Sequence, residues 1–375
     1  MVLPDYKNSI VNVSSSIMKS FELKPIYTPL KELKNLEKYE NVILLIIDGL
    51  GNEFFNKNGK NSFLEKHFVK SVTSTFPSTT TAATTALETG VAPQQHCAMA
   101  WFMYLKEQDL IFAPWAFNPR IPQNHPLNIK RSDIFLEKRI TDKITNSFLI
   151  YGDDMAKRKI NREYDKLKSY TTLNGMFRQI KKAIESSNKR KFILSHWGGF
   201  DGICHSEGCS SAKIKSHFLE LDNKLAAFAD SIKNTNTTVI ITSDHGQIDT
   251  PKSKAINLKD HPELKETLRM PLCGEHRFAY CYVYPEKVKQ FEKYVKTKLK
   301  DICELHKSSD LIDKNYFGLY KPNNKLKSRI GDYVLIMKDN YTLKDWLPNE
   351  KEFYLKAIHG GLSKEEMNVP LIWIK

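Results

Sequence analysis

Acidic and histidine side chains stand in this sequence at spacings that suit metal ions. Asp201 and His205 are four residues apart, so one helical turn would place a carboxylate and an imidazole on the same face. Asp244 and His245 are adjacent and precede Gly246, which permits the sharp bend needed to turn both toward one ligand. Carboxylate oxygen and imidazole nitrogen are ligands that zinc prefers. These two segments therefore predict metal binding or catalysis.

Asp48 and His359 are candidates whose function depends on where the fold places them. Asp48 directly follows the apolar run 41–47, and open α/β sheets bind ligands at the carboxyl ends of such strands. An ordinary turn at the end of a strand is the alternative. His359 precedes two glycines and, taken alone, fits a structural histidine better than a ligand. Together, three carboxylates and three imidazoles divide naturally into two metal sites.

A threonine-rich segment supplies a candidate nucleophile, Thr75. It lies just before Phe76 and Pro77, and the proline favours a tight turn there. Ser78 is a suitable N-cap for a helix that is predicted to end at Gly90. A hydroxyl near a helix N-terminus is well placed to meet a phosphate, because the exposed N–H groups favour anions. The alternative is a capping segment without chemistry.

Apolar runs predict the strands that must position these side chains. Buried strands are expected over 41–47, 191–195, 238–242 and 369–374, and helices over 172–186 and 213–232. Strands and helices in alternation predict a doubly wound α/β fold with a mostly parallel sheet and ligands at the strand ends. Residues 255–345 mix Lys-rich helical pieces with strand-like pieces, so we expect a small α+β cap insertion there. The metal-binding core would comprise 1–254 and 346–375.

Composition limits the class of protein. The chain has 375 residues, 41% of them hydrophobic, which is ample for a buried core. A net charge of +14 favours an anionic substrate or partner. The six cysteines form no CxxC pair, which argues against a zinc ribbon or disulfide scaffold and indicates reduced thiols in a cytoplasm. With no apolar leader-like segment and no apolar run of about 20 residues, we expect a cytoplasmic protein without a membrane segment. Export without a cleavable signal is the alternative.

Taken in order along the chain, these segments resemble the alkaline phosphatase superfamily, in its type I phosphodiesterase/nucleotide pyrophosphatase branch. The matching stretches are LLIIDGLG, TSTFPSTTTAATTALETGVAPQQH, GGFDGICH, TSDHG and HGGLSKEEMNVPLI. The resemblance implies an alkaline-phosphatase-like fold. The Cys/Ser-x-Pro-x-Arg site of sulfatases is absent, which argues against that branch.

The resemblance also implies two divalent metal ions, Zn²⁺ or alternatively Mn²⁺. One ion would be held by Asp201, His205 and His359. The second would be held by Asp48, Asp244 and His245, with the hydroxyl of Thr75 bound to it. Thr75 would then attack phosphorus and form a covalent phosphothreonine intermediate.

The activity that the resemblance implies is hydrolysis of phosphodiester or pyrophosphate bonds in a small anionic phosphate ester, such as a nucleotide. We expect no membrane partner and no requirement for nucleic acid, and the sequence leaves the oligomeric state open. An asparagine of the family is missing from the stretch HCAMAWF, and Cys97 stands where the family has glycine. A phosphomonoesterase or phosphonate hydrolase on the same scaffold, or an inert anion- or nucleic-acid-binding protein, therefore stays open.

Four residues are expected to contact the substrate: Phe76, Trp101, Tyr104 and Arg277. Trp101 and Tyr104 belong to an aromatic-rich stretch, 93–120, which could line a pocket and stack on a base or could serve packing alone. Arg277 and its neighbours Glu275 and His276 are candidates for the rim of the site.

Overall fold

A seven-stranded sheet forms the centre of the computed structural model, which describes residues 1–124, 126–158, 164–348 and 350–375. The strand order is β2-β18-β9-β1-β8-β6-β7. The pairings of β1, β6, β7, β8 and β9 with one another are parallel, whereas β18 runs antiparallel to β2 and β9. The mostly parallel α/β architecture predicted from the sequence is therefore confirmed. The strands are β1 (Asn41–Ile47), β2 (Phe68–Thr73), β6 (Ser147–Gly152), β7 (Leu167–Tyr170), β8 (Lys191–Trp197), β9 (Thr237–Thr242) and β18 (Asn368–Ile374).

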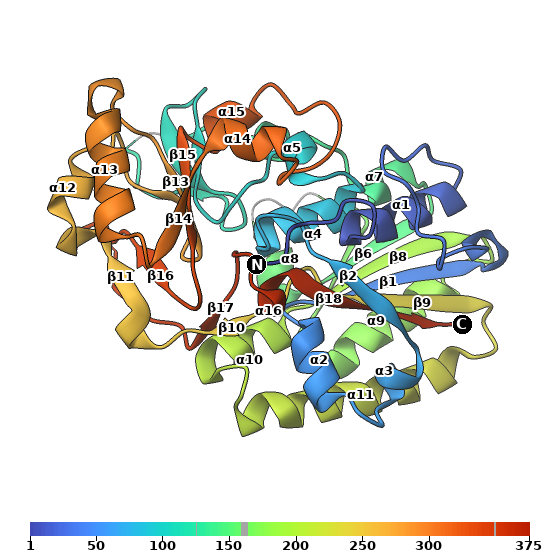
Figure 1. Ribbon diagram of the computed structural model, residues 1–375. Helices are drawn as coiled ribbons and strands as arrows, with labels where there is room; N and C mark the ends of the chain where they lie inside the picture. Colours follow the sequence, from blue (N-terminus) through green and yellow to red (C-terminus); the bar gives the residue numbers. More distant parts are fainter. Residues whose placement is uncertain (125, 159–163, 349) are drawn as a thin grey trace.

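Strand β1 is buried on both faces because helices cover the sheet from both sides (Figure 1). Val42, Leu44 and Ile46 pack against α1 (Ile10–Ser20) and α4 (Thr80–Thr89). The alternate side chains of the strand pack against α9 (Leu173–Glu185) and α11 (Ala212–Ile232) on the other face. Each fully buried aliphatic side chain of this kind contributes roughly 1.5–3 kcal/mol. The uninterrupted apolar run of β1 thus holds two helical layers together.

A second unit beside the central sheet is built on a four-stranded antiparallel sheet of order β12-β13-β15-β14 (Figure 1). One face of it packs against α13 (Val288–Lys298). The other face packs against the aromatic-rich stretch, which forms a small sheet of β3, β4 and β5. The strands are β3 (Met103–Leu105), β4 (Leu110–Ala113), β5 (Asn118–Pro119), β12 (Cys273–Glu275), β13 (Phe278–Cys281), β14 (Cys303–Lys307) and β15 (Tyr333–Met337).

Two short two-stranded ladders lie where the chain enters and leaves the second unit. They pair β10 (Ile248–Asp249) with β17 (Ala357–Ile358), and β11 (Ala255–Asn257) with β16 (Thr342–Lys344). Because β10 follows β9 closely and β17 immediately precedes His359, the first ladder brings the C-terminal histidine back to the sheet edge.

The remaining helices are short, apart from α10 (Gly199–Glu207). They are α2 (Asn52–Asn58), α3 (Phe63–Lys66), α5 (Pro93–His96), α6 (Arg131–Ile134), α7 (Ile140–Lys143), α8 (Asp153–Ala156), α12 (Pro262–Lys265), α14 (Ser308–Asp313), α15 (Leu326–Arg329) and α16 (Lys364–Met367). Single 3-10 turns lie at Leu36–Lys38, Lys252–Lys254, Leu258–Asp260 and Pro285–Lys287. No helix in the described ranges has the length and apolar character needed to cross a bilayer. All six cysteines lie in these ranges and are free.

Candidate active site

The acidic and histidine segments meet at one edge of the central sheet. Asp48 follows β1, and Asp244 and His245 follow β9, its parallel neighbour. Asp201 and His205 lie on α10, which begins just after β8 on the other side of β1. The carboxyl ends of these parallel strands lie together, so side chains far apart in the sequence converge.

Two groups of ligand atoms result, and they share His245. The ligand atoms of Asp48, Asp244 and His245 lie within 4.8 Å of one another, and so do those of Asp201, His245 and His359. His205 adjoins the second group, with its Nε2 3.2 Å from Asp201 Oδ2. The structure thus brings together all six carboxylates and imidazoles that the sequence singled out.

The charge of this cluster suits divalent cations. Burial, and next the negative charges of Asp244 and Asp201, raise the pKa of Asp48 well above its ordinary value. Asp48 Oδ1 and His359 Nδ1 are buried without a hydrogen-bond partner among the described residues. Buried carboxylates at such close quarters are stable when they are paired or coordinate a metal. The oxygen and nitrogen donors are those that zinc-like ions accept, so the residues fit two such ions.

Further contacts fix the orientation of the candidate ligands. The Thr84 hydroxyl donates a hydrogen bond of 2.8 Å to Asp244 Oδ2. His205 Nδ1 lies 2.8 Å from the carbonyl oxygen of Ala357, which leaves Nε2 facing the cluster. Partners of this kind set the tautomer and direction of a metal ligand.

Two buried neighbours of the cluster were not predicted. His196, near the end of β8, places its Nε2 3.1 Å from Asp48 Oδ2. The side-chain amide of Gln247 donates to an Asp201 carboxylate oxygen and to the Asp201 carbonyl oxygen. Gln247 directly follows the motif TSDHG, and His196 lies two residues before the motif GGFDGICH. Their position beside the motifs is the signal that could have identified them.

The hydroxyl of Thr75, the predicted nucleophile and metal ligand, forms no described hydrogen bond with the clustered side chains, and its role stays a prediction. Thr75 is fully buried, its hydroxyl donates to the Pro77 carbonyl oxygen at 3.0 Å, and it is not part of the described cavity wall. The turn continues further than the sequence suggested. The N-cap is Thr79 rather than Ser78, and α4 begins at Thr80.

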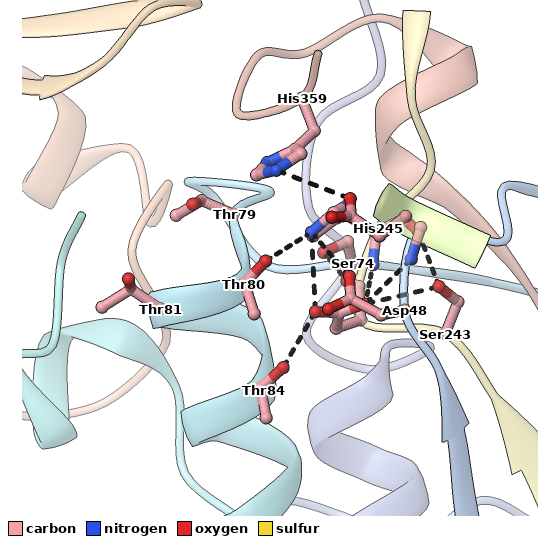
Figure 2. A network of polar contacts seen from close by, with 12 residues as sticks. Asp48, Ser74, Thr79, Thr80, Thr81, Thr84, Ser243, His245 and His359 are labelled. Atoms are coloured by element: carbon pink, nitrogen blue, oxygen red, sulfur yellow. Dashed lines mark hydrogen bonds and ion pairs between the residues drawn. The ribbon is translucent and has the colours of Figure 1, made fainter. Parts of the chain in front are cut away.

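The Thr80 hydroxyl lies beside the cluster. Its Oγ1 lies 3.1 Å from His245 Nε2, and its side chain lines the cavity beside the cluster (Figure 2). As the first residue of a ten-residue helix, it stands among backbone N–H groups that attract anions. The preceding Thr79 hydroxyl donates to the carboxylate of Glu275, whose pKa burial raises to about 7.

A cavity of about 900 Å³ opens over this cluster. One wall carries Asp48, Thr80, Asp201, His205 and His359. The other walls come from the aromatic-rich stretch, the second unit, and core segments that include 152–155, 170–171 and the chain after Lys344. Trp101, predicted to contact the substrate, lines the cavity and is 40% exposed. The volume of the cavity is at the upper end of the range for small-molecule sites.

The other three expected substrate contacts do not reach this cavity in the described structure. Phe76 is fully buried in the apolar cluster between the two units. The Tyr104 hydroxyl donates to Asp109 on the outer surface. Arg277 is buried and forms a bidentate ion pair with Glu366. These three predictions are corrected, because packing or ion pairing accounts for each side chain. The neighbours of Arg277, Glu275 and His276, do line the cavity.

Comparisons with known proteins agree with this architecture. Murine ectonucleotide pyrophosphatase/phosphodiesterase 5 superposes with a TM-score of 0.68 at 18% identity, over 88% of this chain and 87% of that chain. An inactive variant of the same murine protein, in complex with AMP, superposes with a TM-score of 0.67 at 18% identity, again over 88% of this chain and 87% of that chain. Phosphonoacetate hydrolase from Sinorhizobium meliloti 1021, in complex with phosphonoformate, gives 0.62 at 16% identity, over 88% and 89% of the two chains. At these identities the likeness shows a shared fold.

The family model of type I phosphodiesterase/nucleotide pyrophosphatase matches residues 42–361, which is most of the chain. A search of curated proteins finds no match. The matched range contains all six clustered carboxylates and imidazoles as well as Thr80. This chain therefore belongs to the type I phosphodiesterase/nucleotide pyrophosphatase family and is a hydrolase of phosphoester or phosphoanhydride bonds.

Proposed function

We propose that this protein is a two-metal phosphodiesterase or pyrophosphatase that uses Thr80 as its nucleophile and acts on nucleotide-type substrates. The observation that carries the proposal is the position of the Thr80 hydroxyl. It stands at the N-terminus of α4 and 3.1 Å from His245, the residue shared by both ligand groups.

Each proposed metal site uses residues of the cluster. Asp201, His205 and His359 would hold one ion, and Asp48, Asp244 and His245, with the Thr80 hydroxyl, would hold the other. We propose Zn²⁺, with Mn²⁺ as the alternative. When bound, such ions lower the pKa of a coordinated hydroxyl and neutralise charge on a phosphoryl group.

The residues of the chain orient the nucleophile and the phosphoryl group. His245 Nδ1 lies 3.0 Å from the Gly246 carbonyl oxygen, which favours a proton on Nδ1 and leaves the lone pair of Nε2 facing Thr80. Thr80 Oγ attacks phosphorus, the bond to the leaving oxygen breaks, and a phosphothreonine ester forms. Water then cleaves this ester and restores the hydroxyl. The N–H groups at the start of α4 face the phosphoryl oxygens throughout.

The size and lining of the cavity support a nucleotide-type substrate. A cavity of about 900 Å³ with an exposed Trp101 at its wall can hold a base beside a phosphate. The AMP complex of the murine protein is in keeping with this substrate. We further propose that residues 255–345 act as a cap over the cavity. The cytoplasmic location expected from the sequence stays a prediction.

A phosphonate hydrolase is the second candidate, because phosphonoacetate hydrolase shares the fold at a TM-score of 0.62. Its reaction would use the same nucleophile but break a carbon–phosphorus bond. Hydrolysis of phosphonoacetate in preference to phosphodiesters would favour this candidate.

The proposal is tested by metal analysis together with hydrolysis of bis-p-nitrophenyl phosphate and p-nitrophenyl phosphate. We expect about two ions per chain and preference for the diester, activity abolished in Thr80→Ala, and activity largely kept in Thr75→Ala. Preference for the monoester would indicate a phosphatase. Unchanged turnover in Thr80→Ala, or a metal-free protein without turnover after supply of Zn²⁺ and Mn²⁺, would contradict the proposal.

A further inference from the structure

Lys344, the last residue of β16, is a buried cation in the wall of the active-site cavity. It is only 3% exposed, and no carboxylate among the described residues offsets its charge. Its Nζ donates to the Phe353 carbonyl oxygen at 3.0 Å and lies 3.4 Å from His276 Nδ1. It also lies 4.9 Å from the ring centres of Trp346 and Phe353.

The electrostatics of this lysine are unusual for a purely structural residue. Burial lowers the pKa of Lys344 to about 8, and no neighbouring acid offsets that effect in the described structure. Burial, and next the positive charge of Lys344, lower the pKa of His276 well below its ordinary value. The imidazole is therefore neutral at pH 7 and able to accept a hydrogen bond, while the lysine is still largely protonated.

A buried charge without a counter-ion is costly, so an anion that binds beside it is favoured. An ammonium has three N–H donors, and the two polar partners described here leave one for a ligand. Arg120, another cation of the cavity wall, differs in being paired with Glu350 at 2.8 Å. Lys344 thus has an N–H donor and a positive charge available for a ligand, whereas the charge of Arg120 is already paired with Glu350.

The position of Lys344 connects it to the proposed nucleophile. His276, its neighbour in space, directly follows Glu275, and Glu275 accepts the hydroxyl of Thr79 beside Thr80. All of these side chains except Thr79 line the same cavity. A ligand with its phosphorus at Thr80 could therefore extend along this wall toward Lys344.

We propose that Lys344, assisted by His276, binds a second anionic group of the substrate, apart from the phosphorus that Thr80 attacks. The group is an oxyanion, either a second phosphate or a carboxylate. This inference rests on the proposed function, since it assigns the substrate class of the same site: phosphate compounds with two anionic groups, rather than simple diesters.

Calorimetric binding of small phosphonates to the metal-loaded protein tests the inference without requiring turnover. The probes are alkylphosphonates of increasing chain length that end in methyl, carboxylate or a second phosphonate. We expect that, at one chain length or more, a phosphonate with an anionic end binds with higher affinity than the phosphonate of equal length that ends in methyl. We call this ratio of affinities the anionic advantage. Lys344→Met should reduce that advantage about 10-fold or more, as expected for a hydrogen bond to a charged group, and Lys344→Arg should keep most of it.

The matched control is Lys351→Met, which removes an exposed lysine from the wall of the same cavity. It should leave the advantage unchanged. An advantage absent at every length in the wild type, an advantage that survives in Lys344→Met, or an equal loss in Lys351→Met would each overturn the inference. Thermal melting verifies that Lys344→Met is folded, and Lys344→Gln replaces it if it is not.

The same probes separate the two anions, because a carboxylate end and a phosphonate end are compared at equal length. Failure of this inference is also distinct from failure of the proposed function. Hydrolysis of bis-p-nitrophenyl phosphate needs no second anion, so a protein that cleaves it but shows no anionic advantage would keep the proposed function and lose only the subsite.

Discussion

The buried ion pair of Arg277 and Glu366 gives a sharp prediction for stability. Arg277 Nε and Nη2 donate to the two carboxylate oxygens of Glu366, each at 3.0 Å. The same guanidinium also donates to backbone carbonyl oxygens within 338–341. Glu366 accepts the N–H of Gly361 at 2.8 Å, two residues after His359. The pair therefore ties the second unit to the loop that carries a candidate metal ligand.

Arg277→Met should lower the free energy of unfolding by about 3 kcal/mol. Loss of one partner of a buried pair costs roughly 3–5 kcal/mol, because the other charge is left buried and unpaired. We expect the lower end of this range, since Glu366 keeps the N–H groups of Gly361 and Ser363. Urea unfolding followed by tryptophan fluorescence measures the change.

Arg269→Met is the matched control, because it removes an arginine from the same unit whose ion pair is exposed. Arg269 lies 3.2 Å from Asp332, with side chains 41% and 46% exposed, so its loss should cost about 0–1 kcal/mol. The double variant Arg277→Met/Glu366→Gln should be more stable than Arg277→Met, because no unpaired charge remains. Equal losses in the two single arginine variants would refute this reasoning.

Three further predictions concern the site and the core around it. Thr84→Val should weaken metal binding about 10–100-fold, measured by titration of the metal-free protein, because Asp244 loses the donor that orients it; unchanged affinity would argue against that role. Removal of metal with EDTA should lower the melting temperature, because an ion present at 100 times its Kd stabilises the fold by about 2.7 kcal/mol; an unchanged melt would indicate that the cluster binds no ion. Asp222→Ala should destabilise the protein by about 1–2 kcal/mol in urea, because the Asp222 carboxylate caps α3 by accepting the N–H groups of Phe63 and Leu64 at 2.9 and 2.8 Å; a loss no larger than that of an exposed surface substitution would contradict this.

The sheet and the six clustered ligands could be predicted because their signals are local. A continuous apolar run such as 41–47 reads as a strand buried on both faces, and that is how β1 packs. Parallel strands then bring Asp48 and Asp244 to one edge, whatever their separation in sequence. The motif order identified the family, and the family model confirms it.

The residue that we propose as the nucleophile, Thr80, differs from the Thr75 predicted from the sequence, because the helix begins later than the sequence suggests. A hydroxyl at a helix N-terminus meets phosphate, but Thr75 precedes that terminus by several residues and Thr80 begins the helix. With several consecutive hydroxyl residues at 78–81, all suited to an N-cap, propensity does not determine where the first turn starts. Tertiary contacts of Thr79 with Glu275 and of Thr80 with His245 accompany that start in the structure.

Substrate contacts were less predictable, because residue type does not say which wall a side chain joins. Phe76 and Arg277 suit a nucleotide site by chemistry, yet one fills an apolar cluster and the other pairs with Glu366. Lys344 reaches the cavity because it belongs to β16. This strand pairs with β11, although most of the sequence of the second unit separates the two strands. Such long-range placement has no signature in a single sequence.

Mass spectrometry of the acid-quenched enzyme during turnover of bis-p-nitrophenyl phosphate tests the central claim most directly. Thr75 and Thr80 lie on one tryptic peptide that follows Lys70, and fragmentation distinguishes them. The account predicts a p-nitrophenyl phosphate ester on Thr80. An adduct on Thr75, or rapid turnover with no threonine adduct in the quenched steady state and in a pre-steady-state burst, would contradict it.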